Sequence, residues 1–222
     1  MKLCAVVPCY NEEERIAGVV GGLREAGLED IIVVDDGSGD RTSEKAKDAG
    51  AFVIRRGVNG GKGAALKAGM AEATGRLFDA AITLDGDGQH DPGEIPKFRA
   101  AAGDFDIIIG NRMAESAKMP WLRRQTNRFT SWVVSALAGA RIHDSQSGYR
   151  LIRIATWNSL TLTSSRYDLE SEIIIRAARK GARIGEVPIS AIYHEAAASS
   201  INPAVDTYRF LRLALKALFL WR

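Results

Sequence analysis

At residues 80–92 the sequence reads AAITLDGDGQHDP, a short apolar run followed by two carboxylates one residue apart. The run predicts a buried strand, so Asp85 and Asp87 come directly after its end. In an open α/β sheet, ligands bind beyond the carboxyl ends of the strands. Carboxylates there attract a hard divalent cation, which in turn attracts phosphates, and Gly86 lets the backbone approach such a ligand closely. The alternative is an acidic turn before a helix that starts at Pro92.

Strand and helix patterns alternate around this stretch. We expect strands over residues 2–7, 30–34, 51–55, 77–84 and 106–110, with helices after Asn11 and over 42–49, 64–73 and 92–102. Asn11 and Glu14 have the spacing of a capping box. Further on, we expect a helix over 121–140, a strand or turn over 147–154, a helix over 169–180, strands over 182–187 and 189–193, and a terminal helix over 205–222. The alternation predicts an α/β fold with a mainly parallel sheet flanked by helices.

Composition limits the class of protein. The chain has 222 residues and a net charge of +3, which fits one large domain, here 1–203, with a helix over 204–222, and gives no reason to expect nucleic acid as a partner. Its two cysteines, Cys4 and Cys9, form no disulfide framework. No signal-peptide layout and no run of the ~18 apolar residues of a membrane span is found. We therefore expect a cytoplasmic protein, free or bound to the cytoplasmic face of the membrane.

Two more strand ends carry polar side chains. Pro8-Cys9-Tyr10-Asn11-Glu12 follows the first strand and Asp35-Asp36-Gly37-Ser38 the second. In neighbouring parallel strands these groups lie side by side, where carboxylates can bind the base or ribose of a nucleotide. The alternative for Asn11 and Asp36 is helix capping.

A glycine-rich loop over residues 57–63 precedes a helix but fails the Walker pattern, because Gly63 stands where Ser or Thr is required. Lys62 at the start of that helix is placed to face a nucleotide. The alternative for the loop is a flexible turn.

Together these segments resemble the family 2 glycosyltransferases with the GT-A fold. The resemblance spans about residues 2–195 and is carried, in order, by Val7–Glu12, Val34–Ser38, Asn59–Gly63, Asp85–Gln89 and Ser147-Gly148-Tyr149-Arg150. The branch that it is most similar to is the dolichyl- or polyprenyl-phosphate sugar synthases. The fold that this implies is a Rossmann-like GT-A domain.

The resemblance implies a role for each matching residue. Tyr10, Glu12 and Asp36 would hold the nucleoside of a UDP- or GDP-sugar, in a donor site that also includes Pro8, Asn11, Lys62 and Gly86. Asp85, Asp87 and Gln89 would bind Mg²⁺ or Mn²⁺, which neutralises charge on the leaving diphosphate. Arg112 would bind phosphate, and Arg124 and Arg128 the phosphate of a lipid acceptor, because a guanidinium donates two bonds at once. The expected catalytic residues are thus Asp85, Asp87 and Arg112.

Two helices extend this prediction. Arg124, Arg128 and Trp132 share one helix face, suited to the junction of a phosphate and a lipid tail, or simply to a solvated surface. The terminal helix is basic and amphipathic, so we expect it to contact a membrane surface, another subunit or the domain itself.

The loop over 193–203 departs from the family, since it contains no Arg or Lys. His194, Ser199, Ser200 or Asn202 would have to replace the basic residues that clamp the donor diphosphate in the branch.

Other functions stay open at this point. The acceptor could be a saccharide or small molecule, which would need a general base such as Asp144. A sugar-1-phosphate nucleotidyltransferase would carry its glycine-rich loop after the first strand, where this chain has Pro8–Glu12. A non-catalytic nucleotide-binding or membrane scaffold is disfavoured by the presence of both Asp85 and Asp87.

Overall fold

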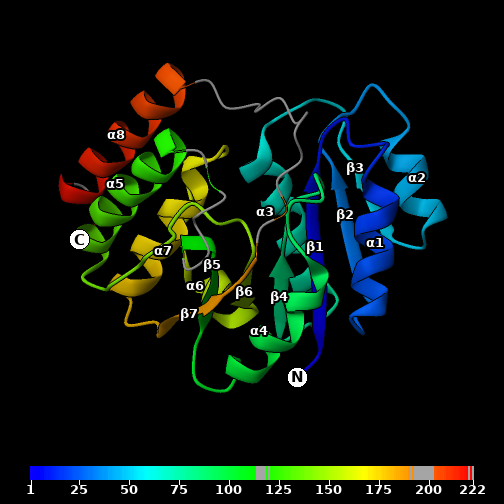
Figure 1. The fold of residues 1–222 in the computed structure, drawn as a ribbon, viewed down its shortest axis with the longest axis horizontal. Coiled ribbons are helices and arrows are strands. Elements are labelled where there is room, and N and C mark those ends of the chain that lie inside the picture. Colours follow the sequence, from blue (N-terminus) through cyan, green and yellow to red (C-terminus); the bar gives the residue numbers. More distant parts are fainter. Residues whose placement is uncertain (114–118, 120, 191, 193–202, 220, 222) are drawn as a thin grey trace.

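The computed structural model describes residues 1–113, 119, 121–190, 192, 203–219 and 221. In this part of the chain, seven strands form one sheet in the order β3-β2-β1-β4-β6-β5-β7 (Figure 1). The strands are β1 Leu3–Cys9, β2 Ile31–Asp35, β3 Phe52–Arg55, β4 Ala80–Thr83, β5 Ile107–Asn111, β6 Arg150–Arg153 and β7 Ile184–Pro188. β6 is antiparallel to both neighbours and the other pairs are parallel. The predicted α/β class with a mainly parallel sheet is confirmed.

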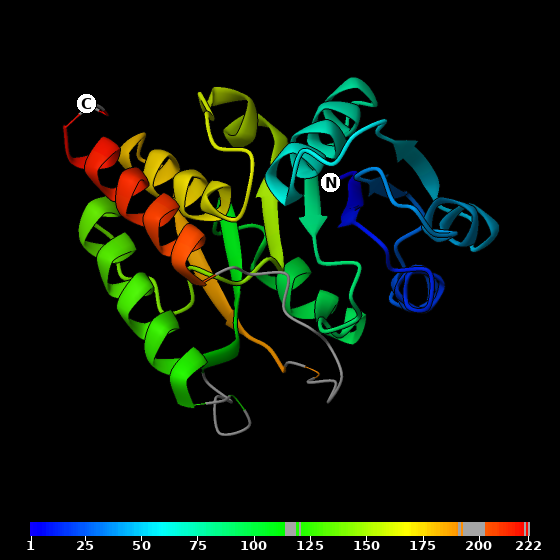
Figure 2. The ribbon, with the colours of Figure 1, turned by 90° about the horizontal axis from the view of Figure 1, so that it is seen from above.

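Helices cover both faces of the sheet. They are α1 Ile16–Glu25, α2 Thr42–Asp48, α3 Lys62–Gly75, the 3₁₀ turn η1 Pro92–Glu94, α4 Ile95–Ala101, α5 Trp121–Ala138, α6 Ile154–Ser159, α7 Asp168–Arg179 and α8 Pro203–Phe219. One core lies under α1, α2 and α4, and the other under α3 and α5–α8. β1 and β2 are buried along nearly their whole length, as expected for parallel strands covered on both faces. In Figures 1 and 2, α5, α7 and α8 gather at one end of the sheet, far from α1 and α2.

The capping prediction for Asn11 is wrong. Helix α1 begins only at Ile16, and its N-cap residue, Arg15, makes no side-chain capping bond. Asn11 instead has a φ of +55°, a conformation that Asn tolerates better than most residues, and its Oδ1 accepts the Gly39 N–H at 2.9 Å. The side chain therefore joins the loops after β1 and β2.

Other element boundaries also differ from the predictions. β1 does not end at Pro8 but continues through it. The pairing of β1 with β4 ends before Pro8, so no residue of β4 requires an N–H from this position. α3 begins two residues early, at Lys62, because Gly61 turns the chain with a φ of +91°. The expected strand over 189–193 is absent at Ile189, Ser190 and Ile192, and the rest of it lies outside the described residues. In the described ranges, no helix has the length and apolar character needed to cross a membrane.

Candidate active site

The loops that follow β1, β2 and β4 meet at the carboxyl edge of the sheet, as predicted. The Asp36 N–H donates to the Cys9 carbonyl at 2.9 Å, and the Gly86 N–H donates to the Pro8 carbonyl at 3.3 Å. A Cβ at position 86 would lie 2.7 Å from the Cys9 Cβ, so glycine is required for the β4 loop to come this close to β1. Pro8, Asp36 and Gly86 therefore lie beside the predicted metal ligands.

Lys62 places its ammonium between two carboxylates. Its Nζ lies 2.6 Å from Asp85 Oδ1 and 2.6 Å from Glu170 Oε1, which belongs to α7. Burial acts to raise the pKa of Asp85, but the neighbouring charge of Lys62 outweighs it, so the pKa falls below its usual range. Gly148 covers this ion pair, since a Cβ there would lie 2.7 Å from Lys62 Nζ. Lys62 thus keeps Asp85 ionised and fixes its direction.

Asp87 and Glu12 add more negative charge to this edge. Burial and the charge of Asp85 raise the pKa of Asp87, and burial and the charge of Asp87 raise that of Glu12. Asp87 Oδ1 accepts the Gln89 backbone N–H at 3.0 Å. Among the described residues, no three Asp, Glu, His or Cys side chains form a complete metal site. Asp85, Asp87 and Gln89 nevertheless offer the oxygen donors that Mg²⁺ and Mn²⁺ prefer, in a place with excess negative charge.

The carboxylate of Asp36 already has several donors. It accepts the N–H of Gly60 at 3.1 Å and of Gly61 at 2.6 Å, and it pairs with Arg56. These bonds tie the glycine-rich loop to the end of β2, so this loop has a defined place at the edge. Tyr10, in contrast, is 47% exposed and lies on the surface of the same edge.

Arg112 follows β5 and is locked by Asp144. Its Nε and Nη2 donate to the two carboxylate oxygens at 2.8 Å each, and its backbone N–H donates to Oδ2 at 3.1 Å. Asp144 is fully buried, and the hydrogen bonds from Arg112 keep its pKa below the usual range although burial acts to raise it. The charge of Arg112 also lowers the pKa of Asp85, which places the arginine near the carboxylates. Both oxygens of Asp144 are thus held by Arg112, which argues against Asp144 as the general base that a saccharide acceptor would need.

Helix α5 carries the two arginines that were predicted to bind the acceptor phosphate, Arg124 and Arg128. Arg124 is half-buried, and its Nε lacks a hydrogen-bond partner among the described residues. Arg128 and Trp132 are exposed, as a shared outer face requires. Arg123 had no predicted role, but its positive charge offsets part of the increase in the pKa of Asp87. His194, Ser199, Ser200 and Asn202 lie outside the described residues.

Sequence reasoning missed three residues that support the site. Glu170 is the second partner of Lys62, and its place on the buried side of α7 was a usable signal, because a buried acid requires a partner. The Nδ1 of His90 accepts the Asp85 N–H at 3.2 Å, and burial lowers the pKa of His90 to about 4. Arg150 is buried and donates to the carbonyls of Ser145, Ser147 and Glu170, so it fixes the turn that carries Gly148.

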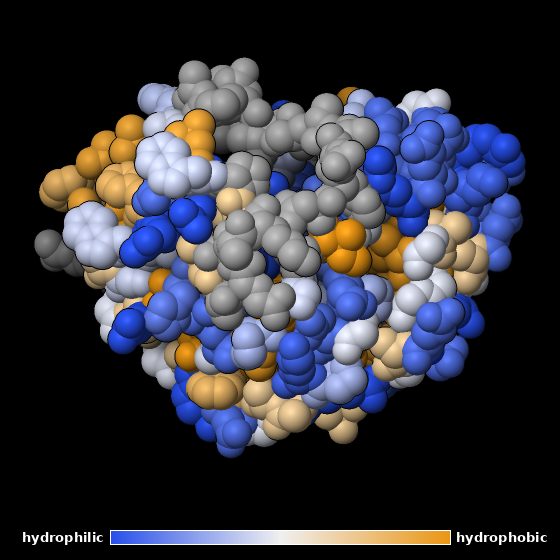
Figure 3. Space-filling model, viewed as in Figure 1, coloured by the Kyte–Doolittle hydropathy of each residue, from blue (hydrophilic) through white to orange (hydrophobic). Residues whose placement is uncertain are grey.

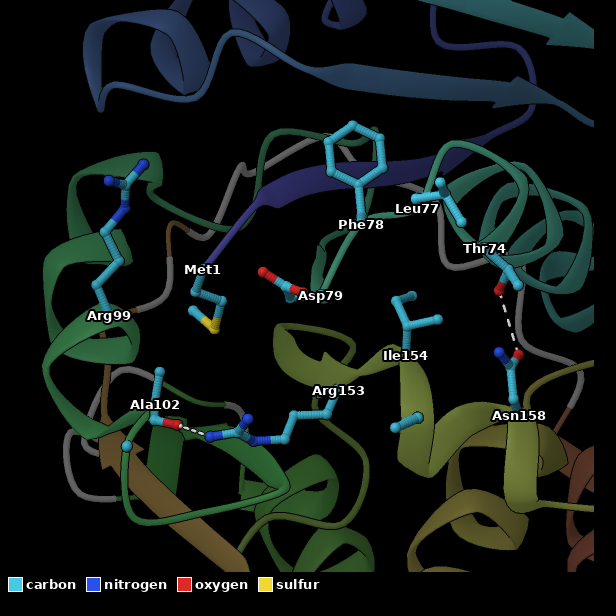
Figure 4. Close-up of a pocket in the computed structure, with 12 residues that line it drawn as sticks. Met1, Thr74, Leu77, Phe78, Asp79, Arg99, Ala102, Arg153, Ile154 and Asn158 are labelled. Atoms are coloured by element: carbon cyan, nitrogen blue, oxygen red, sulfur yellow. Dashed lines mark hydrogen bonds between the residues drawn. The ribbon is translucent and has the colours of Figure 1, made fainter.

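A hollow of about 790 Å³ lies at the other end of the sheet (Figure 4). Met1, Phe78 and Asp79 line it, at the amino ends of β1 and β4. Arg153 on its wall donates to the Ala102 carbonyl at 2.7 Å, and Thr74 is hydrogen-bonded to Asn158. These polar groups thus have partners within the wall, and the hollow lies at the edge of the sheet opposite to Asp85 and Asp87.

Comparison with known proteins agrees with this geometry. Residues 4–162 match the model of the family described as glycosyl transferase family 2. The chain belongs to this family. It is therefore a glycosyltransferase, as the five sequence segments predict.

The relatives of this family 2 glycosyltransferase include enzymes that act on lipid phosphates. It is 31% identical over 217 residues to an undecaprenyl-phosphate mannosyltransferase of Micrococcus luteus, covering 92% of this chain and 89% of the relative. It is 32% identical over 235 residues to a UDP-N-acetylglucosamine–dolichyl-phosphate N-acetylglucosaminyltransferase of Methanococcus voltae, covering 95% and 94%.

A solved structure confirms the GT-A-like fold. Glucosyl-3-phosphoglycerate synthase of Mycobacterium tuberculosis superposes with a TM-score of 0.73 at 18% identity, covering 98% of this chain and 78% of the synthase. That synthase was solved with Mn²⁺ and UDP, and also with Mg²⁺ and UDP.

Proposed function

We propose that the protein transfers a sugar from a UDP- or GDP-sugar to a polyprenyl or dolichyl phosphate, with inversion and with Mg²⁺ or Mn²⁺ as cofactor. The observation that carries this proposal is the placement of Asp85 and Asp87 beyond β4, where the charge of Arg112 acts on Asp85 and that of Arg123, on α5, acts on Asp87. The full-length similarity to two lipid-phosphate sugar transferases supports the acceptor. The Mn²⁺ and UDP in the synthase of similar fold support the donor and the metal.

Asp85, Asp87 and Gln89 would hold the metal ion. When bound, such an ion neutralises the charge that develops on the leaving nucleoside diphosphate. Lys62 uses two of its three N–H groups on Asp85 and Glu170, and we propose that the third binds a donor phosphate oxygen. Tyr10, Glu12 and Asn11 would contact the nucleoside. Asp36 would join them through its Oδ2, which accepts the Gly61 N–H and can accept a second bond, whereas its Oδ1 already accepts bonds from Arg56 and Gly60.

The arginines would position the acceptor. Arg112 is held rigid by Asp144, and Arg124 has a buried Nε without a partner in the described part of the chain, so both are prepared to bind an anion. Arg128 adds a further charge on the same helix. A phosphate acceptor is already anionic and needs no general base, which fits the unavailability of Asp144 for proton transfer. Catalysis would then depend on positioning and on charge stabilisation.

A transfer assay tests the proposal. The protein is incubated with radiolabelled UDP- and GDP-sugars and polyprenyl phosphate in detergent, with Mn²⁺, Mg²⁺ or a chelator. We expect metal-dependent label in the organic phase, lost in Asp87→Asn and retained in Leu77→Ser, a surface change at the far end of the sheet. Label found only in a water-soluble product would reject the lipid acceptor and favour a saccharide, which the lack of Arg and Lys over 193–203 would then explain.

A further inference from the structure

Helices α5 and α8 lie side by side on α7 (Figures 1 and 2). The inner sides of both helices pack into the core. Val134 and Leu137 of α5 and Leu213 and Ala217 of α8 are buried, and the guanidinium of Arg176 stacks 3.9 Å from the centre of the Trp221 ring. Neither helix therefore needs its outer side for folding.

The outer sides of the two helices nevertheless carry large apolar residues. They are Trp121, Leu122, Phe129 and Trp132 of α5 and Tyr208, Leu211, Leu215, Leu218 and Phe219 of α8, each at least 51% exposed. We call this surface the two-helix face. In α8, the positions 208, 211, 215, 218 and 219 recur at helical spacing on one side, opposite the buried Leu213 and Ala217. Figure 3 shows apolar side chains gathered over this end of the molecule. Apolar residues concentrated in this way mark a surface that binds a partner.

The charge of the two-helix face identifies the partner. Its helices contain six cations, Arg123, Arg124, Arg128, Arg209, Arg212 and Lys216, against one acidic residue, Asp206. A second copy docked through the same face would set these cations against their own counterparts, which is unfavourable. An anionic lipid surface instead attracts them, and exposed Trp, Tyr and Phe prefer the boundary between headgroups and acyl chains.

We propose that the two-helix face docks the protein on an anionic lipid bilayer, with α5 and α8 lying in the plane of the headgroups. The purpose of this docking rests on the proposed function: a protein docked in this way would hold Arg124, on the same helix α5, where it can meet a lipid phosphate at the membrane surface. Its physical basis, apolar and aromatic side chains among cations, does not depend on the reaction.

Vesicle binding tests this proposal without any sugar transfer. The full chain is sedimented with vesicles of phosphatidylcholine, with and without about 30% phosphatidylglycerol, at several salt concentrations. We expect binding that requires phosphatidylglycerol and weakens with salt. The double variant Leu215→Ser/Leu218→Ser should bind at least about tenfold more weakly. Arg212→Glu/Lys216→Glu should weaken binding by more than the about fivefold expected for each cation lost.

Leu77→Ser is the matched control, because Leu77 is 82% exposed but lies at the far end of the sheet. It should bind like the unchanged protein, and nucleotide titration of all variants checks that they are folded. Equal binding of every variant, or a dimer that the Leu215→Ser/Leu218→Ser change dissociates, would overturn the proposal. Transfer to a short, water-soluble polyprenyl phosphate without vesicle binding would reject the docking face and keep the function. Vesicle binding without transfer to any polyprenyl phosphate would reject the proposed function and keep the docking face.

Discussion

The ion pair between Arg112 and Asp144 offers the sharpest test of how this site is built. Asp144→Asn keeps the shape of the side chain but replaces one charged oxygen with an NH₂ group. That group would face Nε or Nη2 of Arg112, each of which now donates to Asp144 at 2.8 Å. The substitution thus removes the negative charge and sets one donor against another.

The expected cost follows from burial. The Asp144 side chain is 0% exposed and that of Arg112 is 9% exposed, so water cannot replace the lost bonds. Breaking a buried pair by removing one partner costs about 3–5 kcal/mol, because a charge is left without compensation. Against a total stability of roughly 5–15 kcal/mol for a domain, Asp144→Asn should lower the urea midpoint by a large fraction.

The loss should depend on pH. The folded-state pKa of Asp144 lies below its unfolded value of about 3.9, so the ionised carboxylate stabilises the fold. This contribution is complete above about pH 5 and is lost as the pH falls through about 4 and then through the folded-state pKa. Asn does not titrate, so the difference in unfolding free energy between the two proteins should narrow in acid.

Urea unfolding from pH 7 down to pH 3, followed by tryptophan fluorescence, measures both effects. Glu44→Gln is the matched control, because Arg41 holds Glu44 through the same two nitrogens, at 2.9 Å and 2.7 Å, but on the surface. We expect no measurable change for Glu44→Gln. The reasoning fails if Asp144→Asn is as mild as this control, or if its cost is the same at every pH.

Three further predictions concern the surroundings of the site. Gly148→Ala should weaken donor binding and lower stability by about 1–3 kcal/mol, because its Cβ would lie 2.7 Å from Lys62 Nζ; calorimetry and urea unfolding that match the unchanged protein would contradict this. The free energy of unfolding should decrease as the pH falls from about 6.5 to about 4, because His90 takes up a proton in the unfolded chain but stays neutral while it is buried. His90→Gln should make the free energy of unfolding less dependent on pH in this range, and an unchanged dependence would exclude the histidine as its origin. Burial raises the pKa of the Cys4 thiol to about 12 and also raises that of Cys9, so neither should react with a disulfide reagent at pH 8 before urea unfolds the protein; rapid labelling of the native chain would show that the thiols are accessible.

Much of the fold could be predicted from the sequence because its strands are buried on both faces. Such strands appear as continuous apolar runs, and the polar residues after them mark the carboxyl edge. The juxtaposition of the Pro8, Asp36 and Gly86 loops was therefore predictable. The direction of β6 was not, since four residues of a strand carry no signal of parallel or antiparallel pairing.

The partners of individual side chains were harder to predict. The sequence placed Lys62 near a nucleotide, yet its ion pairs with Asp85 and Glu170 join residues that are 23 and 108 positions away. Asn is a residue that often caps helices, but the side chain of Asn11 instead accepts the N–H of Gly39 from the neighbouring loop. This contact depends on the tertiary structure and could not be predicted from the local sequence. In α8, the sequence showed an amphipathic helix, but only packing on α7 decides which apolar residues stay outside.

The position of β6 between β4 and β5 has a consequence for synthesis of the chain. β5 pairs with β6 and β7 and has no bond to β4, although it is made directly after it. A nascent chain that ends near residue 113 therefore holds β5 without a place in the sheet, and the gap closes only once β6 has left the ribosome. Completion of the sheet during translation must wait for the second half of the chain, and until then the apolar β5 has no neighbouring strand and is prone to aggregation.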